Sequence, residues 1–467
     1  MPMYVNRKTP RSRPTSGRGP AVLGSVALLG AFCAGYFVHR NELLPLAWRD
    51  GIRGAISGPS DSGGPERANT SVNRGEALPI QTDGVSPELP ERNAEAILAL
   101  GYVQAERARP GGRSGVVAHD PNRAHEGVNL YISGNAPEAV LMDMDGRELH
   151  RWHCNFDAAF PNTTLLPHIS AAIRNYFRRV HLYPTGELLA VFEGVGLIKL
   201  DWDSNLIWTY AGGCHHDLSI ADSGEIYVLT NELRRFPELN PEHDVVDNSI
   251  AVLSAEGKEL RRASILDCIA NSDYRALLGH IPKNFDVLHT NTIKHIAGAP
   301  PDFGPAFRDG NVLISLLTID TVAMVDLELN TVVWAITGLF DEQHEPTLMP
   351  NGNILVFDNH AGPGTSRVVE ISPMSKAVVW SYPGPDDQPF YSDRCSTAAR
   401  LPNGNTLITI SGEGRAVEVT HTGEIVWEFV NPNQFVENGV AMISMLFDVC
   451  RLPEDYCAAG TTSERAQ

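Results

Sequence analysis

The feature that most constrains this chain is a strand pattern that recurs through most of its length. Each copy begins at a turn such as Asn-Gly, continues through two β-rich strands and a second turn, and ends with a strand that carries Trp. In the clearest copies the tryptophans are Trp334, Trp380 and Trp427, spaced 46 and 47 residues apart. Repeats of four short strands at this period are typical of propeller blades. One blade cannot bury both faces of its sheet, so the blades must stack into a ring.

Six copies of the pattern can be recognised, at residues 128–152, 183–210, 221–265, 307–336, 349–382 and 401–429. They predict an all-β, six-bladed β-propeller over residues 115–456, in which the tryptophans fill the space between neighbouring blades. In the third copy Leu260 stands where Trp is expected. We expect the apolar tail at 441–456 to pair beside the first copy, because closing the ring removes exposed sheet edges.

The N-terminus has the pattern of a membrane anchor. Residues 1–19 carry five basic side chains and no acidic one, and residues 20–38 carry no charge. Nineteen residues at about 1.5 Å rise just span a hydrocarbon core of about 30 Å. Because the basic flank should stay in the cytoplasm, we expect a single-pass transmembrane helix with the propeller on the periplasmic or extracellular side. A cleaved signal peptide is the alternative.

The remaining segments are predicted from composition. Residues 39–85, rich in Gly, Ser, Pro, Asn and Asp towards their C-terminal part, should form a disordered, flexible linker. A short docking helix is expected within 86–108, with Gly101 as its C-cap. Residues 457–467 form a C-terminal tail.

Charge and cysteine content restrict the partners. The formal net charge of -19 disfavours binding to nucleic acid, whose phosphates would be repelled. Six of the seven cysteines lie outside the anchor and could form disulfides in an oxidising compartment or remain buried thiols. The oligomeric state stays open.

Three histidine-containing motifs carry the chemical character of the chain. They lie at residues 214–217, 288–291 and 342–346, each just before a strand that we expect to start a blade. Equivalent positions in stacked blades converge on one end of the axis, so these histidines should meet at a channel mouth. There, neutral imidazoles could act as nucleophile, base and oxyanion partner. Adjacent strand residues point to opposite faces, so only one of His215 and His216 should face the channel unless the turn is irregular.

Each motif also has a plainer interpretation. The histidine beside Asp217 could be structural, and His289 and Asn291, which share a strand face, could lie in a solvated loop. A fourth motif, residues 357–359, is predicted on the first strand of the fifth blade. His216, His289 and His344 could also ligate a metal, but no tight ligand spacing is present, so we expect neither metal nor cofactor.

Several runs together and in this order resemble the bacterial arylsulfotransferase family that works without phosphoadenosine phosphosulfate. The resemblance covers roughly residues 95–456. The matching runs are His215-His216-Asp217, His289-Thr290-Asn291-Thr292-Ile293, Gln343-His344, Phe357-Asp358-Asn359, Ser366-Arg367-Val368-Val369-Glu370 and Leu401-Pro402-Asn403-Gly404-Asn405-Thr406.

The resemblance implies a six-bladed propeller outside the cytoplasm that moves a sulfuryl group from an aryl sulfate to a phenol through a histidine. His344 is similar to the nucleophile of the family, and His216 and His289 resemble its catalytic partners. Four further side chains are expected to contact substrate: Asn291, His215, Asn359 and Arg367.

One position departs from the family. The family places an Arg where this chain has Leu317. Losing a charge-assisted contact could cost a few kcal/mol, or roughly a hundredfold in rate. Arg367, from the next blade, is the candidate substitute. The alternative function is therefore a catalytically impaired propeller that serves as a membrane-tethered ligand- or protein-binding module. A quinone-dependent dehydrogenase is disfavoured, because those propellers usually have more blades and an acidic calcium site.

Overall fold

The fold is described from a computed structural model, which describes residues 106–107, 113–163, 171–282, 286–298, 303–385, 389–437 and 439–456. All of these belong to one compact unit, Gly75–Gln467. The predicted cytoplasmic N-terminus, anchor, linker and C-terminal tail lie outside the described residues. Among the described residues, no helix has the length and apolar character needed to cross a bilayer.

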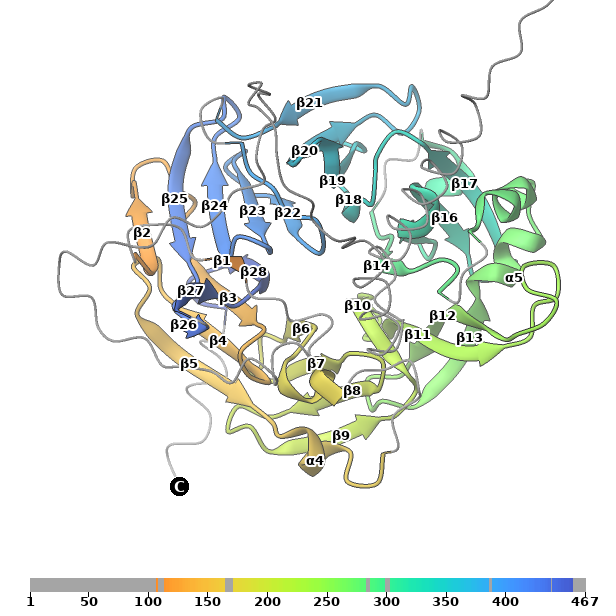
Figure 1. Cartoon of the computed structure of the whole chain (residues 1–467), viewed down its shortest axis with the longest axis horizontal. Coiled ribbons are helices and arrows are strands. Elements are labelled where there is room, and N and C mark those ends of the chain that lie inside the picture. Colours follow the sequence, from red (N-terminus) through yellow and green to blue (C-terminus); the bar gives the residue numbers. More distant parts are fainter. Residues whose placement is uncertain are drawn as a thin grey trace, which may run out of the picture. The chain divides into compact units, whose positions relative to one another are not determined.

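The predicted six-bladed propeller is confirmed, with six antiparallel sheets arranged in a ring (Figure 1). The strands of each blade are given from the channel outward. Blade 1 consists of β28 (Leu446–Leu452), β3 (Val128–Ser133), β4 (Glu138–Met142) and β5 (Glu148–His153), and blade 2 consists of β6 (Arg179–Leu182), β7 (Leu188–Phe192), β8 (Gly196–Leu200) and β9 (Leu206–Tyr210). Blade 3 consists of β10 (Cys214–Ile220), β11 (Ile226–Arg234), β12 (Val245–Leu253) and β13 (Glu259–Ser264). Blade 4 consists of β14 (Thr290–His295), β15 (Val312–Leu316), β16 (Thr321–Asp326) and β17 (Thr331–Thr337). Blade 5 consists of β18 (His344–Leu348), β19 (Ile354–Gly362), β20 (Thr365–Ile371) and β21 (Val378–Tyr382). Blade 6 contains β22 (Thr397–Arg400), β23 (Thr406–Ile410), β24 (Arg415–Val419) and β25 (Ile425–Val430).

The ring is closed from both ends of the propeller chain. The C-terminal strand β28 pairs with β3 and becomes the innermost strand of blade 1, which confirms the expected closure by the tail. The N-terminal strand β2 (Gly115–His119) pairs with β25 as a fifth, outermost strand of blade 6. Each closure pairs strands that are far apart in sequence, so the blades depend on one another for stability.

The repeated tryptophans lie on the fourth strand of their blades and pack against the next blade, as predicted. Trp152 of blade 1 donates a hydrogen bond from Nε1 to the carbonyl of Gly186 in blade 2, at 3.1 Å. Trp427 of blade 6 donates in the same way to Met144 of blade 1, at 2.9 Å. Both indoles are fully buried. Leu260, which replaces Trp in blade 3, is exposed on β13.

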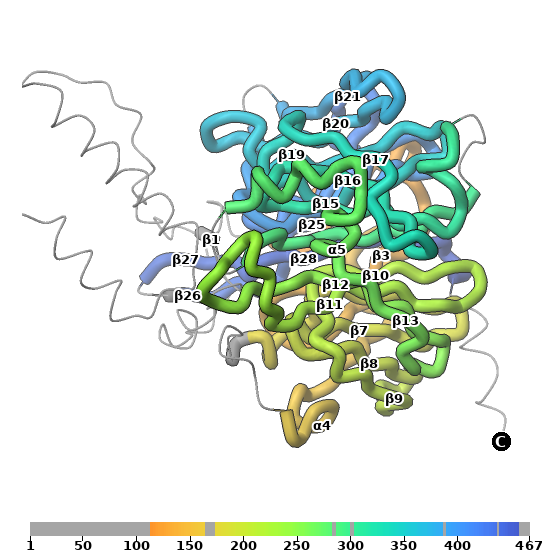
Figure 2. The backbone as a smooth tube through the Cα atoms, turned by 90° about the vertical axis from the view of Figure 1, so that its right-hand side faces the viewer, coloured from red at the N-terminus to blue at the C-terminus, as the bar shows by residue number. Residues whose placement is uncertain are grey.

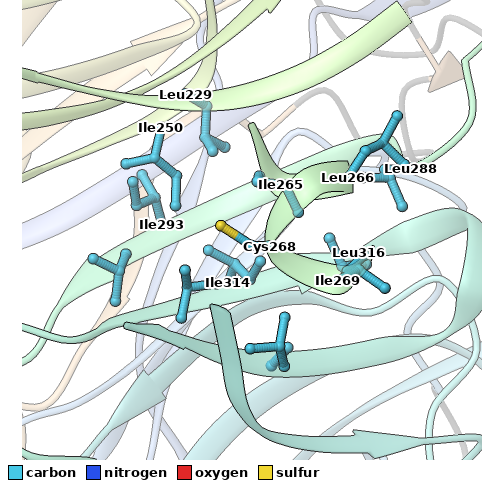
Figure 3. Close-up of a cluster of buried hydrophobic side chains, with 14 of the residues drawn as sticks. Leu229, Ile250, Ile265, Leu266, Cys268, Ile269, Leu288, Ile293, Ile314 and Leu316 are labelled. Atoms are coloured by element: carbon cyan, nitrogen blue, oxygen red, sulfur yellow. The ribbon is translucent and has the colours of Figure 1, made fainter. Parts of the chain in front are cut away.

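Apolar side chains fill the space between blades. Figure 3 shows one such cluster between blades 3 and 4, around α5 (Ile265–Ala270). Ser264 caps this helix by accepting a hydrogen bond from the backbone of Asp267 at 3.1 Å, a contact worth about 1 kcal/mol. The residues labelled in Figure 3 are buried members of this cluster: Leu229, Ile250, Ile265, Leu266, Cys268, Ile269, Leu288, Ile293, Ile314 and Leu316.

Blade-to-blade connections gather on one face, because each connection runs from an outermost to an innermost strand of antiparallel sheets. The extra elements there are α4 (Phe156–Ala159), η1 (Ala171–Asn175), α5, η2 (Arg275–His280), β26 (Gln434–Glu437) and β27 (Val440–Ile443). Figure 2 shows β26 and β27 projecting from the ring. Two further turns, η4 (Pro305–Phe307) and η5 (Leu317–Ile319), lie within blade 4.

The segment expected as a docking helix, 86–108, is described only at its end. There, β1 (Glu106–Arg107) is a strand that pairs with β27, because the open edge of the β26–β27 hairpin provides backbone partners. The five described cysteines are free thiols: Cys154, Cys214, Cys268, Cys395 and Cys450.

Candidate active site at the channel mouth

A buried ion network occupies the channel and supports the candidate site. Arg179 of β6 pairs with Asp217 of β10 at 2.9 Å, Glu345 of β18 at 2.5 Å and Asp448 of β28 at 2.8 Å. Lys294 of β14 pairs with Asp217 at 3.0 Å and Glu345 at 2.6 Å. The five side chains come from five innermost strands, so the network joins five blades across the axis.

The histidines lie next to this network in the chain. His216 directly precedes Asp217, and His344 directly precedes Glu345. In a regular strand these neighbours would point to opposite faces. The innermost strands are irregular here instead, with register shifts in β10, β14 and β18. His216, His289 and Glu345 have φ values of 52°, 46° and 53°, and such left-handed residues at bulges re-aim their neighbours.

Two details of the predicted placement were wrong. The motif at 214–217 lies within β10 and His344 begins β18, so these residues are part of the innermost strands rather than segments before them. Asn359 lies on β19, which is the second strand of its blade. The error arose because the innermost strands are rich in polar residues and lack apolar alternation.

His215 and His216 point to the same side because of the irregular turn. Their Nδ1 atoms are 2.9 Å apart, and Nδ1 of His216 is 3.2 Å from Oε1 of Glu193. Burial lowers the pKa of His215 to about 3. Burial and the charge of Arg178 lower the pKa of His216 well below its ordinary value. Both rings are therefore neutral at neutral pH.

His289 is in a different protonation environment from its neighbour His216. Its Nδ1 lies 2.6 Å from Oδ2 of Asp286, and the centroid of its ring lies 4.8 Å from that of His216. Burial disfavours the imidazolium, but the Asp286 carboxylate outweighs burial and raises the pKa of His289. The site thus combines neutral imidazoles with one that favours the protonated form.

The tautomer of His344 is defined by its hydrogen bonds. Its Nδ1 is 2.9 Å from Oδ1 of Asn359 and 3.0 Å from the carbonyl of Glu342. The Asn359 amide is oriented by its Nδ2, which donates to the carbonyls of Ser392 and Cys395. Both partners of Nδ1 are acceptors, so Nδ1 carries the proton and Nε2 carries the lone pair. Burial lowers the pKa of His344 to about 4.

Blade 4 holds the segment that carries His344. Asn291 donates from Nδ2 to the carbonyl of Gln343 at 2.9 Å, and the Ser315 hydroxyl donates to the same carbonyl at 3.0 Å. The fully buried Gln343 side chain donates back to the carbonyl of Thr321 at 3.1 Å. Asn291 and Asn359, both expected to contact substrate, are therefore placed where they position His344.

Leu317, which stands where the family has Arg, and Arg367, the candidate substitute, lie in different surroundings. Leu317 begins η5, and its backbone N–H donates to the carbonyl of His289 at 3.4 Å. Arg367 donates from Nε to Asp358 at 2.8 Å. In the described part of the chain, Arg367 makes neither an ion pair nor a hydrogen bond with the histidines.

Sequence reasoning missed three charged residues beside the histidines: Arg178, Glu193 and Asp286. Arg178 is buried, and its charge lowers the pKa of both His216 and His344. Glu193 follows β7 and contacts both Arg178 and His216. The only sequence signal was Arg178-Arg179, two adjacent cations ahead of an apolar strand, which looks like an ordinary exposed strand end.

Glu193, His215 and His216 could hold a metal ion, since one ligand atom from each lies within 4.8 Å of the others. This set differs from the predicted rival set of His216, His289 and His344. One observation disfavours a metal at Glu193, His215 and His216. Arg178 Nε is 3.4 Å from Oε2 of the same glutamate and would repel a cation.

Comparisons with known proteins add a family match. The family model described as arylsulfotransferase (ASST) matches residues 179–432, a span that includes His216, His289 and His344. The search of curated proteins gave no match.

Among solved structures, a Bacteroides caccae protein of unknown function is 14% identical, with 70% of this chain and 99% of that chain covered and a TM-score of 0.46. The WD40 propeller domain of Doa1 is 12% identical, with 74% and 97% covered and a TM-score of 0.40. Streptogramin B lyase is 11% identical, with 75% and 98% covered and a TM-score of 0.37. Similarity this low carries no functional inference.

Proposed function

Because the chain belongs to the arylsulfotransferase family, we propose that it transfers a sulfuryl group from an aryl sulfate to a phenolic acceptor through a sulfo-histidine at His344. The observation that supports this most is the pairing of protonation states in the site. His344 presents a lone pair on Nε2, and His289, held by Asp286, favours its imidazolium.

In the first half-reaction, Nε2 of His344 attacks the sulfur of the aryl sulfate and the bond from sulfur to the phenolic oxygen breaks. The electron pair leaves with the phenolate, which takes a proton from the His289 imidazolium. The product phenol departs and SO3 stays on Nε2. The sulfonated ring becomes positively charged, and the Asn359 and Glu342 oxygens that accept from Nδ1 stabilise that charge.

In the second half-reaction, the acceptor phenol occupies the position of the first product. The neutral His289 removes the hydroxyl proton, and the oxygen attacks sulfur. The N–S bond breaks, which returns the electron pair to Nε2 of His344 and the proton to His289. The enzyme is regenerated, so the reaction follows a ping-pong sequence.

The test is turnover of a chromogenic aryl sulfate with a phenol acceptor by the purified full chain. We expect His344→Ala to abolish turnover. When wild-type protein reacts with the donor alone and is then denatured, mass spectrometry should show one SO3 group on His344. His295→Ala is the matched control, because His295 lies on β14 and its ring packs at a tilt against that of Tyr227, outside the site. Full activity of His344→Ala would refute the proposed nucleophile.

A second candidate function is a ligand- or protein-binding module without turnover, which Leu317 favours because it cannot supply the charge that the family uses at that position. It predicts that the wild-type protein binds an aryl sulfate without releasing phenol, and that Leu317→Arg creates turnover. Phenol release by the wild-type protein would exclude this candidate.

For location, we propose the membrane-anchored arrangement in which residues 20–38 span the bilayer and the propeller lies on the periplasmic or extracellular side. Protease treatment of intact cells or spheroplasts tests it. The propeller should be digested or released while a cytoplasmic marker stays protected. Protection of the propeller would overturn this topology.

A further inference from the structure

We propose that Arg178 binds the sulfuryl oxygens and supplies, from blade 2, the positive charge that Leu317 cannot supply from blade 4. This inference rests on the proposed function, because it assigns the anion-binding residue of that reaction. It also makes a statement that can be tested with inorganic sulfate alone.

Arg178, like His216 and His344, directly precedes a residue of the buried ion network. Its backbone N–H donates to the carbonyl of Val191 at 2.9 Å, and Val191 is the residue of β7 that lies opposite Arg179. The next residue, Arg179, is the centre of the ion network. Arg178 therefore precedes a network member just as His216 precedes Asp217 and His344 precedes Glu345.

The guanidinium of Arg178 is only loosely engaged. Its ion pair with Glu193 runs through Nε at 3.4 Å, whereas Arg179 makes three ion pairs at 2.9 Å or less. Within the described ranges, neither terminal nitrogen of Arg178 donates a hydrogen bond to the protein. Two parallel N–H groups of a guanidinium match two oxygens of a sulfate or sulfuryl group, which makes bidentate contact possible.

The charge of Arg178 also acts on the reacting groups. Glu193 contacts both Arg178 and His216, and the charge of Arg178 lowers the pKa of His216 and of His344. It stays close to the ring of Phe447, at 5.3 Å, so one side of the guanidinium is held against an apolar surface. A cation in this position would stabilise the charge on sulfuryl oxygens as the bond to His344 forms.

Glu193 gives the site a resting partner for the cation. Without an anion, the carboxylate partly neutralises Arg178 and also contacts Nδ1 of His216. The long distance means that little interaction is lost when an anion arrives. The family match begins at residue 179, directly after Arg178, so the match itself says nothing about this residue.

The experiment compares wild-type full chain with Arg178→Met, Arg178→Lys and Arg178→Gly in two assays. Calorimetry with inorganic sulfate measures anion binding, and aryl sulfate turnover measures catalysis. We expect Arg178→Met to weaken sulfate binding at least tenfold and to lower kcat/KM by roughly a hundredfold, mostly in kcat. Arg178→Lys should lose less, and millimolar guanidinium should partly restore Arg178→Gly.

Arg234→Met is the matched control, because Arg234 of β11 pairs with Asp247 of β12 and Asp267 of α5, away from the histidines. Its sulfate binding and kcat/KM should stay at wild-type values. Thermal unfolding identifies variants that fail to fold. If Arg178→Met or Arg178→Gly fails to fold, the role of Arg178 is judged from the sulfate binding and kcat/KM of Arg178→Lys, which keeps the positive charge.

The outcomes separate the two proposals. If sulfate binding depends on Arg178 but the wild-type protein releases no phenol, the anion site stands and the proposed function fails. If the wild-type protein turns over and the folded Arg178 variants do so equally well, the proposed function stands and the role of Arg178 is overturned. Wild-type protein that neither binds sulfate nor turns over overturns both.

Discussion

Replacing Arg179 by Met should destabilise the whole propeller, because this side chain joins carboxylates from three other blades. The side chain is buried, and it pairs with Asp217, Glu345 and Asp448 at 2.9, 2.5 and 2.8 Å. The network has two cations and three carboxylates, so the substitution leaves three carboxylates with Lys294. Removing one partner of a buried ion pair typically costs about 3–5 kcal/mol. We expect the free energy of unfolding to fall by about that amount near pH 8.

The pH dependence of this loss has a defined sign. Without Arg179, the buried carboxylates have higher pKa values in the folded protein than in the unfolded chain. Such groups favour the folded state below their unfolded pKa of about 4, and that contribution is lost as pH rises through the folded pKa. The difference between variant and wild type should therefore be smaller at pH 5 than at pH 8.

The assay is urea or thermal unfolding of the full chain followed by circular dichroism at pH 5 and pH 8. Arg147→Ala is the control, because Arg147 forms only an exposed pair with Asp143 and should change the free energy of unfolding by about 1 kcal/mol or less. In Arg179→Met/Glu345→Gln, neutralising one carboxylate should recover part of the loss. A variant that unfolds like wild type at pH 8, or that loses equally at both pH values, would refute the reasoning.

Three further predictions concern the site and the ring. The pH profile of kcat/KM should have an acid limb near pH 4, where His344 becomes protonated, and an alkaline limb where His289 loses its proton; Asp286→Asn should move the alkaline limb to lower pH, as measured with a chromogenic aryl sulfate. Asn359→Leu should lower kcat by roughly a hundredfold with little change in KM, because it removes an acceptor that holds the reactive tautomer of His344; an unchanged kcat contradicts this role. Trp427→Ala should lower the free energy of unfolding by about 3–5 kcal/mol, measured by urea unfolding, because a fully buried indole between blades 6 and 1 is lost.

The blades were predictable because their outer three strands carry the repeated signals. The turns and terminal aromatic residues, such as Trp334 and Trp380, mark where each outer strand begins and ends. The innermost strands carry no such signal, since their side chains face a polar channel. β10, with the sequence CHHDLSI, and β18, with HEPTL, lack the alternation that identifies strands, so their residues were assigned to preceding segments.

The histidines could be found from the sequence, but not their surroundings. Their recurrence at equivalent positions of three blades is enough to bring them to one channel mouth. The bulge that turns His215 and His216 to the same side depends on left-handed backbone at His216. A histidine in the sequence does not predict that conformation. Asp286 and Glu193 come from connections, and only the folded chain brings them to the rings that they contact.

His289 and Arg178 are held differently by their carboxylate partners, and in the proposed reaction this difference suits them to different tasks. His289 and Asp286 are 2.6 Å apart, so the carboxylate keeps its proton-carrying partner in place and tunes its pKa. Arg178 and Glu193 are 3.4 Å apart, so the guanidinium can change partners when an anion enters. A proton donor needs a fixed orientation, whereas an anion-binding cation needs unused donors. The short pair therefore suits proton transfer to the leaving phenolate, and the long pair suits capture of the sulfuryl group.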